Sequence, residues 1–411
     1  MKSRYFAGAV LARAGDEMTG PAVLLLAFAV TGAAVMGSVL MACLTVAAAV
    51  GGPAFGAVLD RSARPERALA CTLAGYAAGI LAVAAAIGRV PLILAVVCAL
   101  AAGTLAPAVA GGWTAQLPMV VPADALPRAS ALDAMSFSAA SLAGPALAAL
   151  VTLWLGARAA VTIAACLVAA AVPAALYLVR SRSAHIRPAQ TQPAQTQPVP
   201  RGTARAGLGH EVIAGLAAIA ARPALLRATV TSAVSYVGIG MLLVCCPLLG
   251  AHRLGGSARG ALLISALSAT SLVVNGLLAR RRWRHPPDVR VLVSTLIIGV
   301  SLVMVALAPG WFTMAAVAVD GAGEGPQLTA LFAVRHREAP QELRGRIFTT
   351  AASLKIGGMA AGSALAGPLA GWSLTGCLLI AAGFEACAAG TYLMIRTGQR
   401  ATRPQADIVG T

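Results

Sequence analysis

The sequence predicts an all-α integral membrane protein whose twelve transmembrane helices form two pseudo-symmetric six-helix bundles. Two observations lead to this fold class. The 411 residues are 59% hydrophobic and only 11% charged, whereas a soluble domain is about 45–50% apolar and about 25% charged. One membrane-spanning helix needs about 20 apolar residues, so twelve spans take roughly 240. Soluble enzymes, coiled coils, disulfide scaffolds and disordered chains are therefore excluded.

The spans are expected in apolar stretches that arginines separate from one another. An even number of spans places both termini on the same side of the membrane. The twelve expected helices cover residues 7–30, 35–58, 68–87, 90–113, 130–152, 157–179, 226–250, 257–279, 290–308, 311–334, 346–371 and 374–395.

The basic residues predict the orientation of these helices. With a cytoplasmic N-terminus, 25 of the 31 Lys and Arg residues fall in inside segments and 4 in outside loops, while Arg13 and Lys355 lie within spans. Cytoplasmic loops carry such an excess, so we expect a multi-pass protein of the bacterial plasma (inner) membrane with both termini cytoplasmic. The net charge of +17 then marks topology, and no nucleic acid is expected as a partner, since only 4% of residues are aromatic. Residues 1–30 stay as the first span because charges interrupt any signal-peptide run.

The connection between the sixth and seventh spans divides the chain into two halves. It contains a doubled PAQTQ pentapeptide between Pro188 and Pro198 that should be extended or disordered. Residues 209–221 follow as a short amphipathic helix, with Val212, Leu216 and Ile219 on one face. The expected domains are an N-terminal six-helix bundle over 1–180, a cytoplasmic linker over 181–225, a C-terminal six-helix bundle over 226–396 and a cytoplasmic tail over 397–411.

The two halves look like copies of each other. Span 2 ends in a Gly–x4–Arg–x2–Arg pattern that recurs at the end of span 8, and spans 5 and 11 share Leu-Ala-Gly-Pro. Matches in the same order indicate a duplication, which is typical of many secondary transporters. The paired segments are Gly56 to Arg64 with Gly276 to Arg284, Pro122 to Arg128 with Pro340 to Arg346, and Leu142 to Pro145 with Leu365 to Pro368.

These residues resemble the major facilitator superfamily over essentially the whole chain. Gly56-x-Val58-x-Asp60-Arg61-x-Ala63-Arg64 looks like its signature loop between spans 2 and 3. Gly144-Pro145 in span 5 resembles the motif of the drug/proton antiporter (efflux) branch, and Gly367-Pro368 repeats it in span 11. The resemblance implies a monomeric, lipid-embedded transporter of a small molecule that uses the proton gradient and no cofactor.

The signature loop predicts a gate. The resemblance implies that Asp60 meets the N-terminal end of span 11, where an anion gains about 0.3–1 kcal/mol from the helix dipole. Arg61 and Arg64 would then hold acids such as Asp124 or Asp133. Such contacts bias one of two transport states. The alternative interpretation is that Asp60 and its arginines are a solvated topology signal.

Span 1 carries Arg13, Asp16 and Glu17 about 12–14 Å from the cytoplasmic edge. Arg13 precedes the two acids by three and four residues, so it can pair with either on one helix face. One acid is then surplus. The cluster is either a structural salt bridge or a proton or cation site that lines the transport cavity.

Spans 10 and 11 carry the other group of intramembrane charges. Asp320 and Glu324 are four residues apart and share a face of a helix interrupted by Gly and Pro. Lys355 lies at a matching depth, so we expect a Glu324–Lys355 pair with Asp320 as the partly free acid. The alternative is a purely structural bridge. Glu385 in span 12 is isolated in the sequence and ranks below these residues as a candidate.

The most concrete functional expectation is proton-coupled efflux of a small lipophilic drug or natural product by alternating access. A proton- or sodium-coupled nutrient importer and a transport-inactive membrane sensor stay open as alternatives. No Walker loop is present, and the eight cysteines lack zinc-ligand spacing with histidine, so neither an ATP-driven pump nor a metal site is expected. An enzyme would have only the Asp320–Glu324 dyad, and we expect none.

Overall fold

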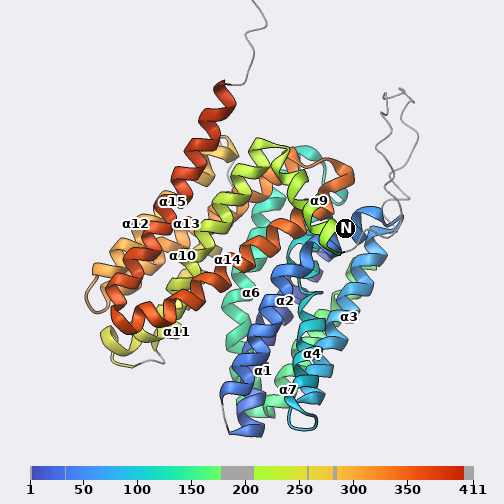
Figure 1. The fold of residues 1–411 in the computed structure, drawn as a ribbon, viewed down its shortest axis with the longest axis vertical. Helices are drawn as coiled ribbons and strands as arrows, with labels where there is room; N and C mark the ends of the chain where they lie inside the picture. Colours follow the sequence, from blue (N-terminus) through green and yellow to red (C-terminus); the bar gives the residue numbers. More distant parts are fainter. Residues whose placement is uncertain (1, 33, 177–207, 257–258, 281–284, 402–411) are drawn as a thin grey trace, which may run out of the picture. The chain divides into compact units, whose positions relative to one another are not determined.

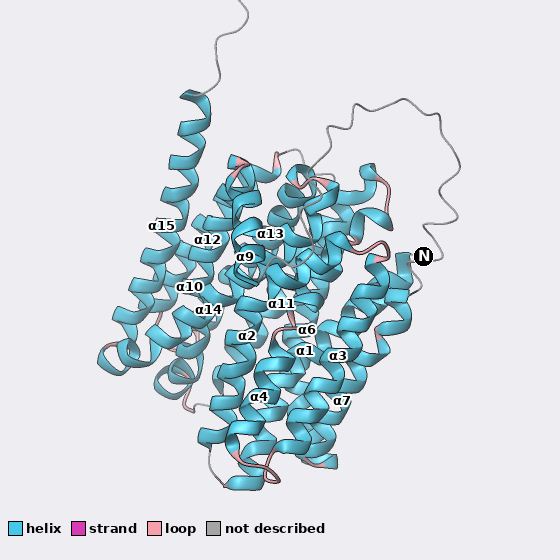
Figure 2. Ribbon diagram, turned by 45° about the vertical axis from the view of Figure 1, so that its right-hand side comes forward, coloured by secondary structure: helices cyan, strands magenta, loops and turns pink. Residues whose placement is uncertain are grey.

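The computed structural model describes residues 2–32, 34–176, 208–256, 259–280 and 285–401, and within these ranges helices are joined by short loops (Figure 2). Contacts divide the chain into two compact units. Unit 1 comprises Met1–Ala218 with Pro340–Ser353, and unit 2 comprises Ile219–Ala339 with Leu354–Thr411. Helix α14 (Arg344–Trp372) therefore contributes its first residues to unit 1 and the remainder to unit 2.

Each of the expected spans falls on observed helix (Figure 1). In unit 1 these helices are α1 (Lys2–Thr31), α2 (Ala34–Arg61), α3 (Pro65–Ala86), α4 (Leu92–Gly103), α5 (Trp113–Ala115), α6 (Leu126–Leu155) and α7 (Ala157–Ala170), followed by the surface helix α9 (Leu208–Ala220). In unit 2 they are α10 (Pro223–Arg253), α11 (Gly260–Arg280), α12 (Pro287–Leu307), α13 (Phe312–Glu338) and α15 (Leu374–Ala401).

Proline and glycine set several helix ends. Helices α3, α10 and α12 each begin with a proline, whose missing N–H is unneeded in the first turn. The chain leaves α6 through Gly156, whose φ of 88° is accessible to glycine without strain. Arg222 is extended just before Pro223 and separates α9 from α10, so the amphipathic helix expected over 209–221 is not the start of the seventh span.

The fourth expected span is less regular than the sequence indicates. Helix α4 ends at Gly103, and the chain continues through a π-helical turn (Ala108–Gly112) into the short helix α5. Pro107 immediately precedes the π-helical turn and cannot donate the hydrogen bond that a continuous α-helix requires. At the other end of the chain, α15 continues to Ala401, past the expected start of the tail at 397. The PAQTQ repeat lies outside the described residues.

Nine helical segments in the described part of the chain are long and apolar enough to cross a membrane. They support a multi-pass membrane protein. Helices α1, α13 and α14 are not among the nine. These three carry Arg13, Asp320 and Lys355, so the intramembrane charges themselves lower their hydropathy.

The same helix pairs pack in both units. In unit 1, α1 and α3 pack on α7, and α2 and α3 pack on α4; in unit 2, α10 and α12 pack on α15, and α11 and α12 pack on α13. These are equivalent pairs if the second six helices repeat the first six. The packing therefore supports the internal duplication that the sequence indicates.

Candidate functional site: buried charges and a helix cap

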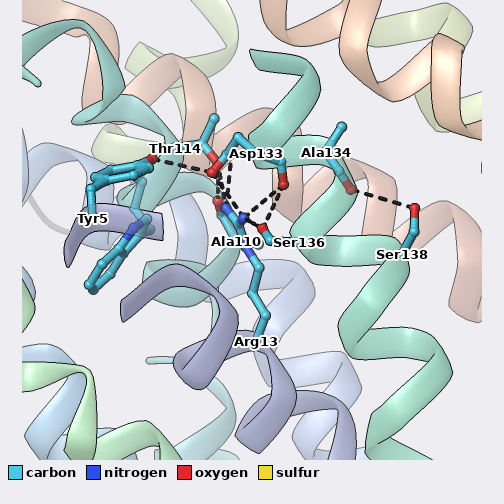
Figure 3. A network of polar contacts seen from close by, with 9 residues as sticks. Tyr5, Arg13, Ala110, Thr114, Asp133, Ala134, Ser136 and Ser138 are labelled. Atoms are coloured by element: carbon cyan, nitrogen blue, oxygen red, sulfur yellow. Dashed lines mark hydrogen bonds and ion pairs between the residues drawn. The ribbon is translucent and has the colours of Figure 1, made fainter. Parts of the chain in front are cut away.

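Arg13 and Asp133 form a buried ion pair in unit 1 (Figure 3). Arg13 Nη1 and Nη2 donate to the two carboxylate oxygens of Asp133 over 2.9 and 3.1 Å. Thr114 and Tyr5 also donate to that carboxylate, over 2.7 and 3.3 Å. The guanidinium further contacts Ser136. Both charged side chains are fully buried, so α1 and α6 are joined in an apolar bundle by a polar network in which both Asp133 oxygens have donors.

This geometry corrects two expectations about charge pairing. Arg13 bonds Asp133, 120 residues away, and not the local acids Asp16 or Glu17. Asp133 is therefore buried with Arg13 and is not held by Arg61 or Arg64, both of which are exposed. Helical spacing identified the local acids as possible partners, but the tertiary partner supplies a bidentate bond together with two hydroxyl donors. The structural interpretation of Arg13 is the one that the contacts favour.

Asp16 and Glu17 lie on different sides of α1. Asp16 accepts a 2.5 Å hydrogen bond from Tyr76 of α3. Glu17 accepts a 3.0 Å hydrogen bond from Ser141 of α6. Gly144 allows α6 to approach at this point, since a Cβ there would lie 2.7 Å from the Cβ of Glu17. Each of the two acids thus accepts a hydrogen bond from a neutral hydroxyl on a different helix.

Asp60 caps the N-terminus of α14. Its two carboxylate oxygens accept hydrogen bonds from the backbone N–H groups of Gly345 and Arg346, over 2.7 and 2.8 Å. The first N–H groups of a helix have no partner within the helix, and Asp60 satisfies two of them from another helix. The contact that the resemblance implies is thus present within unit 1. Its role as a gate is a matter for the proposal below.

Glycine makes this cap sterically possible. A Cβ at Gly345 would lie 2.5 Å from Asp60 Oδ1, and a Cβ at Gly56 would overlap with the Arg346 backbone and the Thr349 hydroxyl. The Gly56 of the signature loop therefore lets α2 contact the first turn of α14. Residues Gly52 and Ser353 continue the same contact, with the Gly52 N–H donating to the Ser353 hydroxyl over 3.0 Å.

In unit 2, Asp320 and Glu324 share a face of α13 but bond different helices. Asp320 is fully buried, and its Oδ1 accepts a 2.9 Å hydrogen bond from Ser301 of α12. Its Oδ2 is buried with no hydrogen-bond partner among the described residues. Glu324 is partly buried and accepts a 3.2 Å hydrogen bond from Tyr236 of α10.

Tyr236 lies between Glu324 and Lys355. Lys355 Nζ donates to the Tyr236 hydroxyl over 3.3 Å and lies 4.3 Å from the centre of its ring. The tyrosine hydroxyl donates in turn to Glu324. The expected association of Glu324 with Lys355 thus includes a residue that sequence reasoning missed, because no spacing rule links α10 to α13 and α14.

Glu385 of α15 is the second residue whose setting the sequence did not predict. It is 1% exposed, and its Oε1 accepts a 2.8 Å hydrogen bond from Ser235. Ser235 accepts a 3.1 Å hydrogen bond from Gln327, one turn along α13 from Glu324. A lone acid in an apolar helix was the available signal, and its neighbours became visible only in the fold.

The two Gly-Pro motifs differ in their surroundings. Gly144 is closely packed on α1, whereas a Cβ at Gly367 would have no atom within 4 Å. Pro145 and Pro368 are both exposed within their helices. The close packing of α14 on α10 depends instead on Gly358 and Gly362, where a Cβ would overlap with the backbone carbonyls of α10.

A family model for the Major Facilitator Superfamily matches residues 5–363. The chain belongs to this superfamily. Major Facilitator Superfamily proteins are transporters, so the chain is a membrane transporter and not an enzyme. The signature loop and two of the three repeated segment pairs lie within the matched range, whereas Leu365 to Pro368 lies just beyond it.

Solved structures of other superfamily members share this fold at low sequence identity. The human organic anion transporter MFSD10 is 15% identical, with 95% of this chain and 98% of that chain covered and a TM-score of 0.71. A bacterial homologue of the iron transporter ferroportin in its outward-facing state is 13% identical, with 96% and 99% covered and a TM-score of 0.73. The E. coli fucose:proton symporter FucP is 13% identical, with 96% and 98% covered and a TM-score of 0.69. No curated protein matches the sequence.

Proposed function

We propose that this protein is a proton-coupled exporter of a small lipophilic organic compound, working by alternating access. The observation that carries the proposal is the setting of Asp320. Its carboxyl group is fully buried in α13, with a single hydroxyl donor and one oxygen without a partner. An unpaired carboxylate in such surroundings costs several kcal/mol, so Asp320 is best accommodated here with a proton.

A coupling group must also be able to lose its proton when the site opens to water. Asp320 lies one helical turn from Glu324, which is in contact with Tyr236 and near Lys355. Lys355 favours the charged form of Glu324, while burial and a second nearby acid favour the neutral form of either. These opposing influences suit a site that exchanges protons between two compartments.

The Asp60 cap supplies the conformational part of the proposal. Two charge-assisted hydrogen bonds at a helix N-terminus stabilise the state in which α2 meets α14. We propose that they break in the alternate state, which gives the signature loop its gating role together with Arg61 and Arg64. The amount involved is small enough for substrate or proton binding to reverse.

A motif and the composition of the chain indicate the direction of transport and the chemistry of the substrate. Export is favoured by the resemblance of Gly144-Pro145 to the antiporter motif, and Gly144 does bring α1 and α6 together. A lipophilic, mainly aliphatic substrate is favoured by the low aromatic content of the chain. The protein would act as a monomer in the bacterial plasma membrane, with both termini cytoplasmic.

The test uses inside-out vesicles with an imposed pH gradient, acidic inside. A panel of lipophilic antibiotics and dyes is added to the wild type, to Asp320→Asn and to Glu324→Gln. Glu342→Gln, which removes an exposed acid, is the matched control. We expect substrate-dependent proton release from the wild type and the control, and its loss in either α13 variant.

Other outcomes would point elsewhere. Full activity in both α13 variants would move the coupling site to Asp16 and Glu17. Proton movement in the same direction as the substrate would identify an importer. Absence of a response to every compound would favour the importer of an untested nutrient or the transport-inactive sensor.

A further inference from the structure

Glu385 is an acid at the middle of a membrane helix. It lies midway along the candidate span Leu374–Ile395 and is 1% exposed. Ionisable residues at this depth are costly and are functional candidates by default. Neither the Asp320–Glu324–Lys355 group nor the Asp60 cap accounts for it.

The surroundings of Glu385 contain hydroxyl and glycine rather than a cation. Ser235 of α10 donates to Oε1, while Oε2 is buried without a hydrogen-bond partner in the described part of the chain. A Cβ at Gly238 would lie 3.3 Å from Oε1, and a Cβ at Gly299 of α12 would lie 3.2 Å from the Glu385 Cβ. The two helices that pack on α15 thus leave just enough room for the carboxyl group, and none of their described cationic side chains bonds to it.

The charged groups that act on Glu385 are the two acids of α13, Asp320 and Glu324. Hydrogen bonds also link the partner of Glu385 to the same stretch of α13. Gln327 donates to Ser235 over 3.1 Å and to Thr295 of α12 over 2.9 Å, and it lies one helical turn beyond Glu324. Glu385 therefore shares a hydrogen-bond network with α10, α12 and α13, next to the turn of α13 that carries Glu324.

Three neighbouring carboxyl groups cannot all be ionised at low cost. Each negative charge makes the next ionisation less favourable, so the protons bind as a coupled set. Lys355 is close to Glu324 and can offset one negative charge. Asp320 and Glu385 both have an oxygen without a donor, which is less costly for a neutral carboxylic acid than for an anion. If Glu385 had a purely structural role, glutamine would serve equally well, because it fills the same volume without a charge.

We propose that Glu385 is a second proton-binding site of unit 2, coupled electrostatically to Asp320. The carboxylate takes one proton from the adjoining aqueous compartment to become a carboxylic acid, and no other bond changes. Ionisation of Asp320 favours protonation of Glu385, and the reverse also holds. Coupling of this second proton to transport rests on the proposed function, whereas proton binding at Glu385 itself does not.

The test is infrared spectroscopy of the full-length protein in lipid nanodiscs without substrate, titrated with pH in H2O and D2O. The protonated carboxyl band is the readout, and the proton itself is the probe. We expect Glu385→Gln to remove one component of this band that the wild type shows at neutral pH. Asp320→Asn should remove another component and make the Glu385 component disappear at a lower pH, because one negative neighbour is gone. Glu342→Gln, which removes an exposed acid that is ionised at neutral pH, should leave the band unchanged there.

The outcomes separate this inference from the proposed function. An unchanged carboxyl band in Glu385→Gln at every pH would overturn the inference, even if the vesicles show proton-coupled export. Loss of the band component together with a wild type that moves no compound would leave the proton site standing and refute the exporter. Glutamine is isosteric with glutamate, so the Glu385→Gln variant should fold. A size-exclusion profile that matches the wild type checks this.

A final measurement addresses coupling. With the dye or antibiotic that gives the largest vesicle response, the number of protons released per molecule transported is compared between wild type and Glu385→Gln. We expect that ratio to fall in the variant while transport of the compound down its own gradient persists. An unchanged ratio would show that the Glu385 proton is not carried through the cycle.

Discussion

At the scale of single residues, the buried acids of the two units have different surroundings. In unit 1, both carboxylate oxygens of Asp133 accept hydrogen bonds from Arg13, Tyr5 and Thr114. In unit 2, one oxygen of Asp320 and one of Glu385 have no partner among the described residues. A carboxylate with donors on both oxygens contributes to a fixed structure, whereas one with an oxygen left without a donor retains capacity to bind a proton. We therefore propose a structural role for the first and proton exchange for the second.

The Arg13–Asp133 pair leads to a stability prediction. Asp133→Asn should lower stability by about 3–5 kcal/mol, because it leaves a buried guanidinium uncompensated. Adding Arg13→Met should recover much of the loss, since no buried charge then remains. Thermal unfolding in detergent measures both effects, with the exposed Asp124→Asn as control. If Asp133→Asn alone is as stable as the wild type, the structural role of the pair is refuted.

Sequence reasoning located Arg13 as an intramembrane charge but could not find its partner. Spacing on one helix is visible in the chain, while Asp133 lies 120 residues away. The same limit applies to Tyr236, which connects Glu324 with Lys355. For Asp60 the position was predicted correctly because the resemblance carried tertiary information that spacing alone lacks.

The Asp60 cap predicts a local change in backbone protection. In Asp60→Ala the N–H groups of Gly345 and Arg346 lose their acceptor, which costs about 0.5–2 kcal/mol for a helix cap. Hydrogen–deuterium exchange at the start of α14 should become about 2- to 30-fold faster, since about 1.4 kcal/mol corresponds to a factor of ten. Peptides from α12 serve as the internal control. Unchanged exchange at residues 345–346 would contradict the cap.

At the scale of helices, small residues decide which surfaces meet. Gly358 and Gly362 of α14 lie against backbone carbonyls of α10, and Gly144 of α6 lies against α1. The sequence placed Gly144 and Gly367 in motifs, but it did not show that Gly144 is packed and Gly367 is not. The positions of Pro, Gly and Arg in the sequence also predicted most helix ends correctly. The interruption after α4 was missed because Pro107 was read as part of a continuous apolar stretch.

Two glycines of the same helix offer a matched comparison. Gly362→Ala should destabilise the protein by about 1–3 kcal/mol, because its Cβ would overlap with the carbonyl of Val237. Gly367→Ala should be neutral or stabilising by up to about 1 kcal/mol, since alanine is the better helix former and the site is open. Thermal unfolding of the two variants in one detergent distinguishes them. Equal shifts would mean that the α10–α14 contact is not close-packed.

At the scale of the whole molecule, the duplication explains why equivalent helix pairs pack in both units. The duplication was predictable because a few motif residues recur in order, and overall hydropathy gave the fold class. The proposed division of function between the halves was not predictable, because the intramembrane charges of one half do not recur at equivalent positions in the other. Asp320 and Glu324 have no counterparts in span 4, where residues 92–115 contain no charged side chain.

The distribution of arginines predicts the orientation of the molecule. A cysteine introduced by Thr411→Cys should react with a membrane-impermeant thiol reagent only after the cells are permeabilised. One introduced by Arg89→Cys, in the exposed loop between α3 and α4, should react in intact cells. Both are made in a variant whose eight native cysteines are replaced by alanine. The reverse labelling pattern would invert the topology and, with it, the proposed direction of proton entry.

The modest hydropathy of α13 and α14 has a consequence for how the protein is made. The two helices are consecutive in the chain, and neither is among the segments apolar enough to span a membrane alone. An acid or lysine near a helix centre opposes entry into lipid by about 2.5–3.5 kcal/mol. We therefore expect neither helix to enter the lipid until earlier helices of the second half have been inserted and can form polar contacts with it. The residues that we propose for proton exchange would thus also make membrane insertion of these helices depend on assembly.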